Sequence, residues 1–202
     1  MAGVVMGRRE RKKLQSKQTI LTAAVKQFME KGVKETSIAD IMNEAELGVG
    51  TFYNYFESKE ALLLCLLEQI VKDTRSLAEQ RMAEKIPASE VLEETLMLTA
   101  EKLDANRFVL PLFLSVADRS SMPRPKRDLI PKMAPAFRTV FTEIVKYGQM
   151  RKDFRKDVPP EIVTELFHSI FQAAAFSSLA IPFTHNVKMK IELLLLGLEP
   201  KK

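Results

Sequence analysis

The sequence predicts an all-α protein, and three observations lead to this expectation. Apolar residues recur at spacings of three and four along most of the chain. Glycine, proline and serine stand where these periodic stretches would begin or end. The alternation of apolar and polar residues that is typical of a half-buried strand persists nowhere. We therefore expect about nine helices, arranged as a small N-terminal and a larger C-terminal domain.

The first 58 residues predict three helices. The first, over about 9–31, is followed by Gly32, a residue typical of helix C-termini. Ser37 is a good N-cap for the second helix, and Asp40 stands three residues later, as in a capping box with a shorter acid. After the tight turn AELG, Gly48 can cap a third helix over about 49–56. The second and third of these helices, with the turn between them, form a helix-turn-helix. In this motif the later helix, here 49–56, lies in the DNA major groove.

Residues 59–202 predict the larger helical domain, and residues 1–58 the smaller one. Ser58 is suited to cap a helix over about 59–84. Further helices are expected over about 89–104, 106–117, 130–151, 160–180 and 187–197. Between the third and fourth of these six helices, residues 119–127 form a basic, proline-bearing loop.

The charge of the chain is concentrated at its start. Residues 1–18 carry six basic side chains and one acidic side chain, Glu10, so their net charge is +5. This equals the formal net charge of all 202 residues. A basic arm on a neutral body indicates a polyanionic partner such as nucleic acid. The alternative is a frayed terminus that aids solubility. Without an apolar run of about 18 residues or a signal peptide, and with Cys65 as its one cysteine, the chain is expected in the cytoplasm and not in a membrane.

The residues offer little for catalysis. The two histidines, His168 and His185, lie seventeen apart, with no cysteine or carboxylate at the spacing of a metal site. The glycine-rich phosphate loop, the dinucleotide fingerprint and the nucleophile elbow are all missing from the sequence. We therefore expect no enzyme, no cofactor and no metal.

Residues 48–62 read GVGTFYNYFESKEAL and concentrate four aromatic residues within five positions. Phe52 and Phe56 are four apart, so they share one helix face and can fill a small core. The tyrosines then point outward with Asn54, which can read adenine, while tyrosine, threonine and lysine side chains can bind phosphates. The expected DNA contacts are Thr36, Ser37, Val49, Gly50, Thr51, Tyr53, Asn54, Tyr55 and Lys59.

The stretch TSIADIMNEAELGVGTFYNYFESKEALL closely resembles the DNA-binding domain of TetR/AcrR-type transcriptional repressors, over about residues 10–65. Two positions depart from the family pattern, since Glu46 replaces the usual turn glycine and Gly48 the usual serine. The resemblance implies a second domain that binds a small molecule and forms a homodimer through its last two long helices. The positions that match are Thr36, Ala45, Gly50, Thr51, Tyr53, Tyr55, Phe56, Ser58, Lys59, Glu60 and Leu62.

The expected function is that of a repressor that binds a near-palindromic operator as a homodimer and is released by a small, lipophilic effector. The alternative is a helical enzyme or ligand carrier whose basic N-terminal part serves as an interaction module. Aromatic residues in the middle of the chain would suit an apolar pocket, although core packing explains them equally well. The candidate ligand contacts are Arg107, Phe108, Phe137, Phe141, His168, Phe171 and Gln172.

Overall fold

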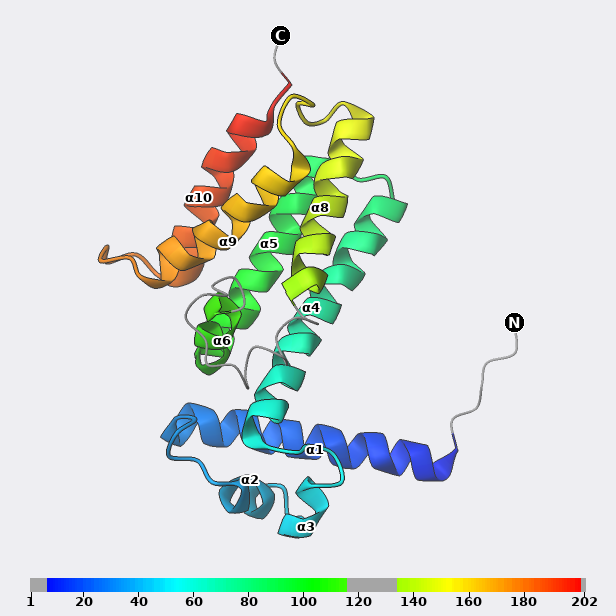
Figure 1. The fold of residues 1–202 in the computed structure, drawn as a ribbon, viewed down its shortest axis with the longest axis vertical. Coiled ribbons are helices and arrows are strands. Elements are labelled where there is room, and N and C mark those ends of the chain that lie inside the picture. The colour runs from blue at the N-terminus through cyan, green and yellow to red at the C-terminus, as the bar shows by residue number, and fades with distance from the viewer. Residues whose placement is uncertain (1–6, 116–133, 201–202) are drawn as a thin grey trace. The chain divides into compact units, whose positions relative to one another are not determined.

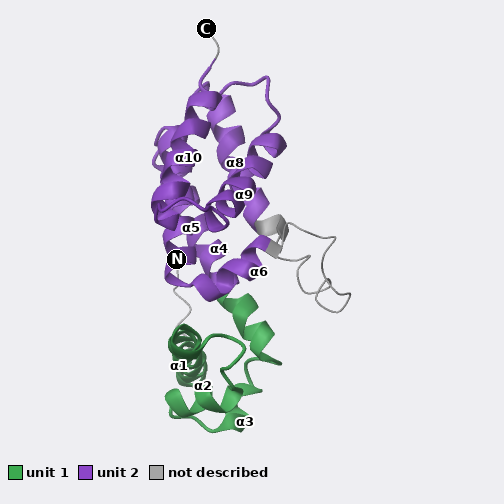
Figure 2. Cartoon of the chain, turned by 90° about the vertical axis from the view of Figure 1, so that its left-hand side faces the viewer, with its two compact units in different colours: residues 1–66 green, residues 67–202 purple. Residues whose placement is uncertain are grey.

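The computed structural model describes residues 7–115 and 134–200, and every regular element among them is a helix (Figure 1). The predicted all-α fold is confirmed. The chain divides into two compact units, Met1–Leu66 and Leu67–Lys202 (Figure 2). The basic loop expected at 119–127 lies outside the described residues. In the parts of the chain that are described, every helix falls short of the length or the hydropathy needed to span a bilayer.

The first unit holds α1 (Arg8–Lys31), α2 (Ile38–Glu44), α3 (Val49–Phe52) and the start of α4 (Lys59–Ala83). Gly32 ends α1 with a φ of 81°, as its position predicted. The third helix is shorter than the predicted 49–56. Beyond Phe52 the chain turns, although the Phe56 N–H still donates to the Phe52 carbonyl at 3.0 Å.

Two phenylalanine rings hold α3 in this unit. Phe52 is completely buried, Phe56 is nearly so, and their ring centroids lie 5.5 Å apart. This confirms the core role predicted from their spacing. A single helical turn is not stable in water by itself, so the position of α3 depends on this burial. The buried apolar residues that α1, α2 and α4 add to the unit are Ile20, Ala23, Ala24, Phe28, Ile41, Met42 and Leu62.

The second unit holds the rest of α4 and the elements that follow, with α5 buried along its length and packed against α8 and α10. The predicted helix over 106–117 is a short 3₁₀ turn followed by α6, and the helix over 160–180 ends at Ala175. The last helix begins at Phe183, directly after Pro182, and not at 187. These elements are α5 (Ala88–Ala105), η1 (Arg107–Val109), α6 (Leu110–Ser115), α8 (Ala134–Arg151), α9 (Pro160–Ala175) and α10 (Phe183–Leu198).

Gly148 marks the closest approach between α8 and its neighbours. A Cβ at this position would overlap the Phe154 ring and lie 2.7 Å from the Cβ of Ala88, at the start of α5. The chain after α8 folds back over the glycine, and the Phe154 N–H donates to the Gly148 carbonyl at 3.2 Å. Close packing therefore explains a glycine within this helix.

We predict that Gly148→Ala destabilises the protein by about 1–3 kcal/mol, because the added methyl group displaces Phe154 or separates α5 from α8. Alanine in an unhindered helix interior stabilises by about 1 kcal/mol instead. Gly197→Ala in α10 is the matched control, since a Cβ there meets no atom within 4 Å. Urea denaturation measures both variants. An equal or greater stability of Gly148→Ala would show that the packing is looser than described.

Candidate nucleic-acid interface

The start of α2 is fixed by a capping box, as predicted. The Ser37 Oγ accepts the Asp40 N–H at 3.0 Å, and the Asp40 carboxylate accepts the Ser37 N–H at 2.8 Å. Lys31, at the end of α1, pairs with the same carboxylate at 2.9 Å. Hydrogen bonds from Ser37 and Lys31 hold the pKa of Asp40 well below its ordinary range. The cap stays charged at neutral pH and ties α2 to α1.

The turn between α2 and α3 contains a strained residue. Glu46 has a φ of 54°, the left-handed conformation that glycine adopts at little cost. Its N–H donates to the Asn43 carbonyl at 3.1 Å, and the Leu47 N–H donates to the Met42 carbonyl at 3.0 Å. This conformation gives a physical reason for the turn glycine of the family pattern. Gly48 then caps α3 through its backbone carbonyl, which accepts the Thr51 N–H at 2.8 Å.

The outer side of α3 and the turn after it present most of the expected DNA contacts. Tyr53 is 60% exposed, and its ring meets that of Phe52 edge to face at 5.5 Å. Asn54 is exposed beside it, as are Val49 and Gly50, and Thr51 is half-buried. One short segment therefore combines an amide, hydroxyls and an apolar group that can reach a nucleic acid.

Tyr55 lies differently from Tyr53. It is half-buried and lines a hollow of about 350 Å³ against the N-terminal part of α1. Lys13, Leu14 and Lys17 line the same hollow, together with Glu10, and the Lys17 ammonium lies 5.6 Å from the centre of the Phe56 ring. Tyr55 thus shares a hollow with basic residues of α1, whereas Tyr53 is exposed.

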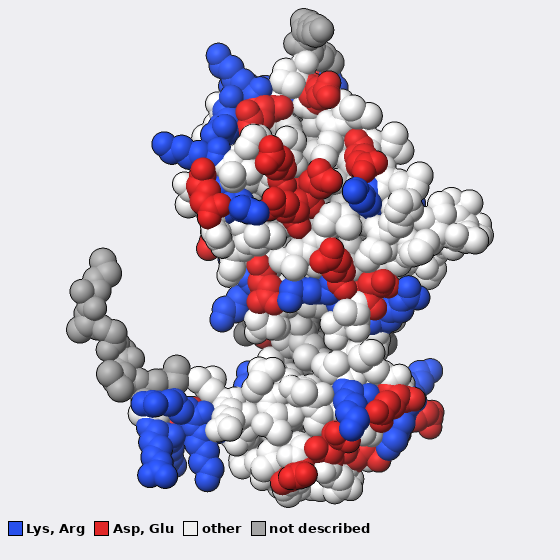
Figure 3. Space-filling model, turned by 180° about the vertical axis from the view of Figure 1, so that it is seen from behind, with Lys and Arg blue, Asp and Glu red and all other residues white. Residues whose placement is uncertain are grey.

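The first turns of α1 form an ordered basic surface. The helix begins at Arg8, and the Gly7 N–H donates to the Glu10 carboxylate at 3.2 Å. Its basic side chains form the blue group at the lower left of Figure 3. These exposed residues, which we call the basic arm, are Arg8, Arg9, Arg11, Lys12 and Lys13.

Two expected contacts, Thr36 and Lys59, are engaged inside the unit. Thr36 is 1% exposed, and its hydroxyl lies 2.7 Å from the Gly32 carbonyl and 3.1 Å from that of Gln27. The Lys59 ammonium donates to the carbonyls of Val33 and Thr36 at 2.5 and 2.6 Å. Sequence reasoning identified both side chains as hydrogen-bond donors. It could not identify their acceptors, which are backbone carbonyls of this unit.

In the second unit, four of the candidate ligand contacts belong to one aromatic cluster. The Phe113 ring lies 5.3 Å from both Phe137 and Phe171 and stacks on His168 at 5.6 Å, and Phe141 adjoins Phe137 at 6.1 Å. Burial lowers the pKa of His168, which favours its neutral form. Sequence reasoning missed the central place of Phe113, because the 106–117 stretch is apolar on most of its sides.

The other three candidates are more exposed than the buried members of this cluster. Arg107 is exposed and pairs with Asp104 at 2.7 Å, and Gln172 is exposed on α9. Phe108 is half-buried in the 3₁₀ turn. Among the polar candidates, His168 is therefore the one that lies within the aromatic cluster.

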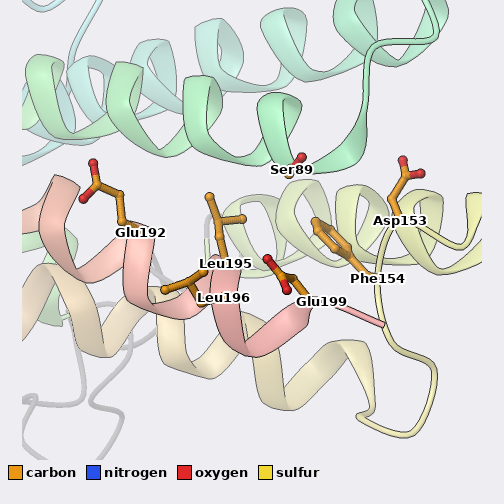
Figure 4. A pocket seen from close by; sticks show the side chains of 7 residues that line it. All are labelled: Ser89, Asp153, Phe154, Glu192, Leu195, Leu196 and Glu199. Carbon is orange, nitrogen blue, oxygen red and sulfur yellow. The ribbon is translucent and has the colours of Figure 1, made fainter. Parts of the chain in front are cut away.

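A groove of about 390 Å³ in the second unit was not foreseen (Figure 4). Leu195, Leu196 and Phe154 line it with apolar side chains, and Asp153, Glu192 and Glu199 line it with carboxylates. One of these, Asp153, accepts the Ala88 N–H at 3.0 Å and pairs with Arg151, and both contacts lower its pKa. Among the described residues no group of three or more histidine, cysteine or acidic side chains is arranged to hold a metal.

Comparisons with known proteins agree with this arrangement. The family model "Bacterial regulatory proteins, tetR family" matches residues 20–66. The uncharacterized HTH-type transcriptional regulator YhgD of Bacillus subtilis is 24% identical over 79% of this chain and 82% of its own. A TetR-family structure from Syntrophomonas wolfei is 29% identical, covers 90% of this chain and 94% of its own, and has a TM-score of 0.68. The repressor FadR of Thermus thermophilus, solved with lauroyl-CoA, is 24% identical over 92% and 96% of the two chains, with a TM-score of 0.66.

We predict that Glu46→Gly stabilises the first unit by about 1 kcal/mol, because glycine adopts a positive φ without a Cβ clash. Glu46→Ala removes the same carboxylate but keeps the Cβ, so it should give no such gain. Thermal unfolding followed by circular dichroism compares the two variants. Equal stability of both would mean that the left-handed conformation carries no strain.

Proposed function

Since the chain belongs to the TetR family of bacterial regulatory proteins, we propose that it represses transcription by binding a near-palindromic operator as a homodimer. The observation that carries this proposal is the exposed side of α3 and the following turn, fixed from behind by Phe52 and Phe56. The family consists of regulators, which favours this function over a helical enzyme or carrier. Acting on DNA, the protein would work in the cytoplasm.

The chemistry of the exposed segment divides the DNA contacts into two kinds. The Asn54 amide can both donate to and accept from an adenine edge in the major groove. Val49 can meet a thymine methyl group, and Gly50 lets the backbone come close to the groove wall. The Tyr53 hydroxyl and the basic arm suit phosphate oxygens, which position the protein without reading the sequence.

The proposed homodimer is supported by apolar side chains exposed on α9 and α10, which pack against each other. Ile162 and Leu166 stand one turn apart on α9, and Met189, Leu193 and Leu196 follow helical spacing on α10. An exposed apolar patch of this kind is typical of an association surface. Two copies with recognition helices about 34–36 Å apart would match successive major grooves.

Ala174, near the end of α9, does not belong to this exposed apolar patch. It is buried on the inner side of α9, together with Phe167 and Phe171. A charge at Ala174 would therefore disrupt the unit itself, and Leu193 is the better position at which to test the homodimer.

For the effector we propose a lipophilic molecule that binds at the Phe113 cluster of the second unit. The rings of Phe113, Phe137 and Phe171 offer apolar surface, and neutral His168 offers a hydrogen-bonding group. The complex of Thermus thermophilus FadR with lauroyl-CoA is an example of such a molecule on this fold. An effector releases DNA only if it favours a dimer whose recognition helices are wrongly spaced. α4 is the covalent route for this coupling, since it runs without a break from Lys59 to Ala83.

The base-reading proposal predicts that Asn54→Ala lowers the ratio of operator to random-DNA affinity by about 5- to 150-fold, the equivalent of about 1–3 kcal/mol. Tyr53→Phe should lower both affinities by similar factors, because a phosphate contact carries no sequence information. Fluorescence anisotropy on an operator selected from random DNA measures both. An unchanged ratio for Asn54→Ala would remove it from the base-reading face.

Removing residues 1–13 should weaken binding to all DNA sequences, because it removes the five side chains of the basic arm. The slope of log K against log salt should become shallower by about 0.9 for each phosphate that the shortened protein no longer binds. The buried residues of α1 begin at Ile20, so the unit should stay folded. A slope that matches the full-length protein would show that the arm only aids solubility.

Leu193→Glu should yield monomers with poor operator affinity, because it places a carboxylate on the proposed homodimer face, where Leu193 is 70% exposed. Met150→Glu is the matched control, since Met150 is 74% exposed on α8, outside that face. Light scattering gives the mass of each variant. A dimeric Leu193→Glu protein with normal operator affinity would contradict the proposed interface.

A further inference from the structure

His168, in the middle of α9, has one ring nitrogen that is engaged and one that is not. Its ring stacks on that of Phe113, with 5.6 Å between the ring centroids. The backbone carbonyls of Phe113 and Leu114 accept a hydrogen bond from the ring. The Nε2 atom is buried and has no hydrogen-bond partner among the described residues. The donor to the carbonyls is therefore Nδ1.

These contacts define Nε2 as a hydrogen-bond acceptor. A neutral imidazole that donates through Nδ1 keeps a lone pair on Nε2. Burial lowers the pKa of His168, and the nearby charge of Arg138 acts in the same direction, so the ring is neutral at neutral pH. Buried acceptors in folded proteins are nearly always paired, because an unpaired one has lost its hydration without compensation. Nε2 is thus suited to accept a hydrogen bond from a bound molecule.

The hydroxyl groups one turn earlier are already engaged. The Thr164 hydroxyl donates to the Pro160 carbonyl at 2.9 Å and lies 3.1 Å from the Thr142 hydroxyl of α8. The Thr142 hydroxyl donates to the Arg138 carbonyl at 2.8 Å. Each hydroxyl has a single proton to donate. Neither threonine can therefore also donate to Nε2 of His168 in this arrangement.

The surroundings of His168 are aromatic. The Phe113 ring meets those of Phe137 and Phe171 edge to face at 5.3 Å, and Phe141 lies 5.2 Å from Phe167. Rings in such a cluster favour a further aromatic ring in offset or edge-to-face contact. Phe137 is half-buried, so part of the cluster is accessible. The chemistry that fits is an apolar aromatic molecule with one hydrogen-bond donor.

We propose that the effector is a phenol, an apolar aromatic molecule whose hydroxyl group donates a hydrogen bond to Nε2 of His168. This ligand class rests on the effector site proposed above. A phenolic hydroxyl is more acidic than an aliphatic one and is therefore the stronger donor. A carboxylate has no proton to donate at neutral pH, and its charge would have to leave water for a cluster of phenyl rings. An ether or a thioester offers acceptors alone, which a second acceptor such as Nε2 does not bind.

Three probes with one apolar body test the proposal on the full-length protein: para-butylphenol, para-butylanisole and para-butylbenzoate. The anisole is the methyl ether of the phenol and lacks its donor, and the benzoate carries a charge. Isothermal titration calorimetry should give the phenol about tenfold higher affinity than the anisole, because a net hydrogen bond contributes about this factor. The benzoate should bind more weakly than the phenol. Equal affinities of phenol and anisole would overturn the proposal, as would a tighter benzoate or a phenol that does not bind.

The ring nitrogens give a direct view of the proposed contact. The chain has two histidines, so their ¹⁵N resonances are readily separated. Saturation with para-butylphenol should shift the Nε2 resonance of His168 and leave Nδ1 protonated, whereas para-butylanisole should leave Nε2 without a hydrogen bond. An Nε2 resonance that does not respond to bound phenol would place the hydroxyl elsewhere and overturn the proposal.

Variants separate the acceptor from the apolar site. His168→Phe keeps a planar ring but removes the acceptor, so the ratio of phenol to anisole affinity should fall to about one. An unchanged ratio would contradict the proposal. His185→Phe is the matched control, since His185 is exposed on α10 and its loss should leave the ratio intact. Phe113→Leu should weaken both probes by a similar factor, because it removes aromatic contacts and no donor or acceptor. If His168→Phe does not fold, the three probes on the unaltered protein still decide.

The proposed function and the ligand class fail in different ways. If the unaltered protein selects no DNA sequence from a random pool, the proposed function is wrong, while calorimetry still decides whether His168 binds a phenol. If phenol and anisole bind equally and both lower operator affinity, the effector site stands and the role of His168 is wrong.

Discussion

The placement of α3 rests on the burial of Phe52. Four helical residues cannot hold their conformation in water, so α3 keeps its position only because the core fixes one of its side chains completely. Tyr53 follows directly and is exposed, with Asn54 beyond it. The surface that we propose to meet DNA is thus separated from the core by a single peptide bond. A change that loosens Phe52 or Phe56 would alter DNA binding without touching a DNA contact.

Polar contacts fix the parts of the first unit that the aromatic core does not reach. Lys31 and Ser37 hold Asp40 at the start of α2, and Lys59 holds the preceding loop. The second unit is organised by packing, with α5 enclosed and Gly148 allowing α8 to approach it closely. The outer sides of α9 and α10 keep exposed apolar residues, which a second copy would cover in the proposed homodimer.

Two of the long helices could be predicted to within one residue at each end, because periodicity and caps report on them directly. The first predicted helix, 9–31, is Arg8–Lys31, and the fourth, 59–84, is Lys59–Ala83. The third was predicted too long, since Phe56 keeps helical spacing to Phe52 across a turn. The contact between Lys59 and Thr36 joins residues 23 apart, and no local pattern encodes it. The central place of Phe113 in the aromatic cluster could not be predicted for a similar reason. Only its tertiary contacts distinguish it from other apolar residues.

The central claim is that the outer side of α3 and the following turn meets the bases of DNA. Amide chemical shifts of the ¹⁵N-labelled protein, recorded with and without the selected operator, test it most directly. The account predicts that operator DNA changes the shifts of residues 48–55 most and those of the basic arm less. Random DNA should change the shifts of the basic arm more than the shift of Asn54. If residues 48–55 kept their shifts while the protein was saturated with operator, the claim would be contradicted.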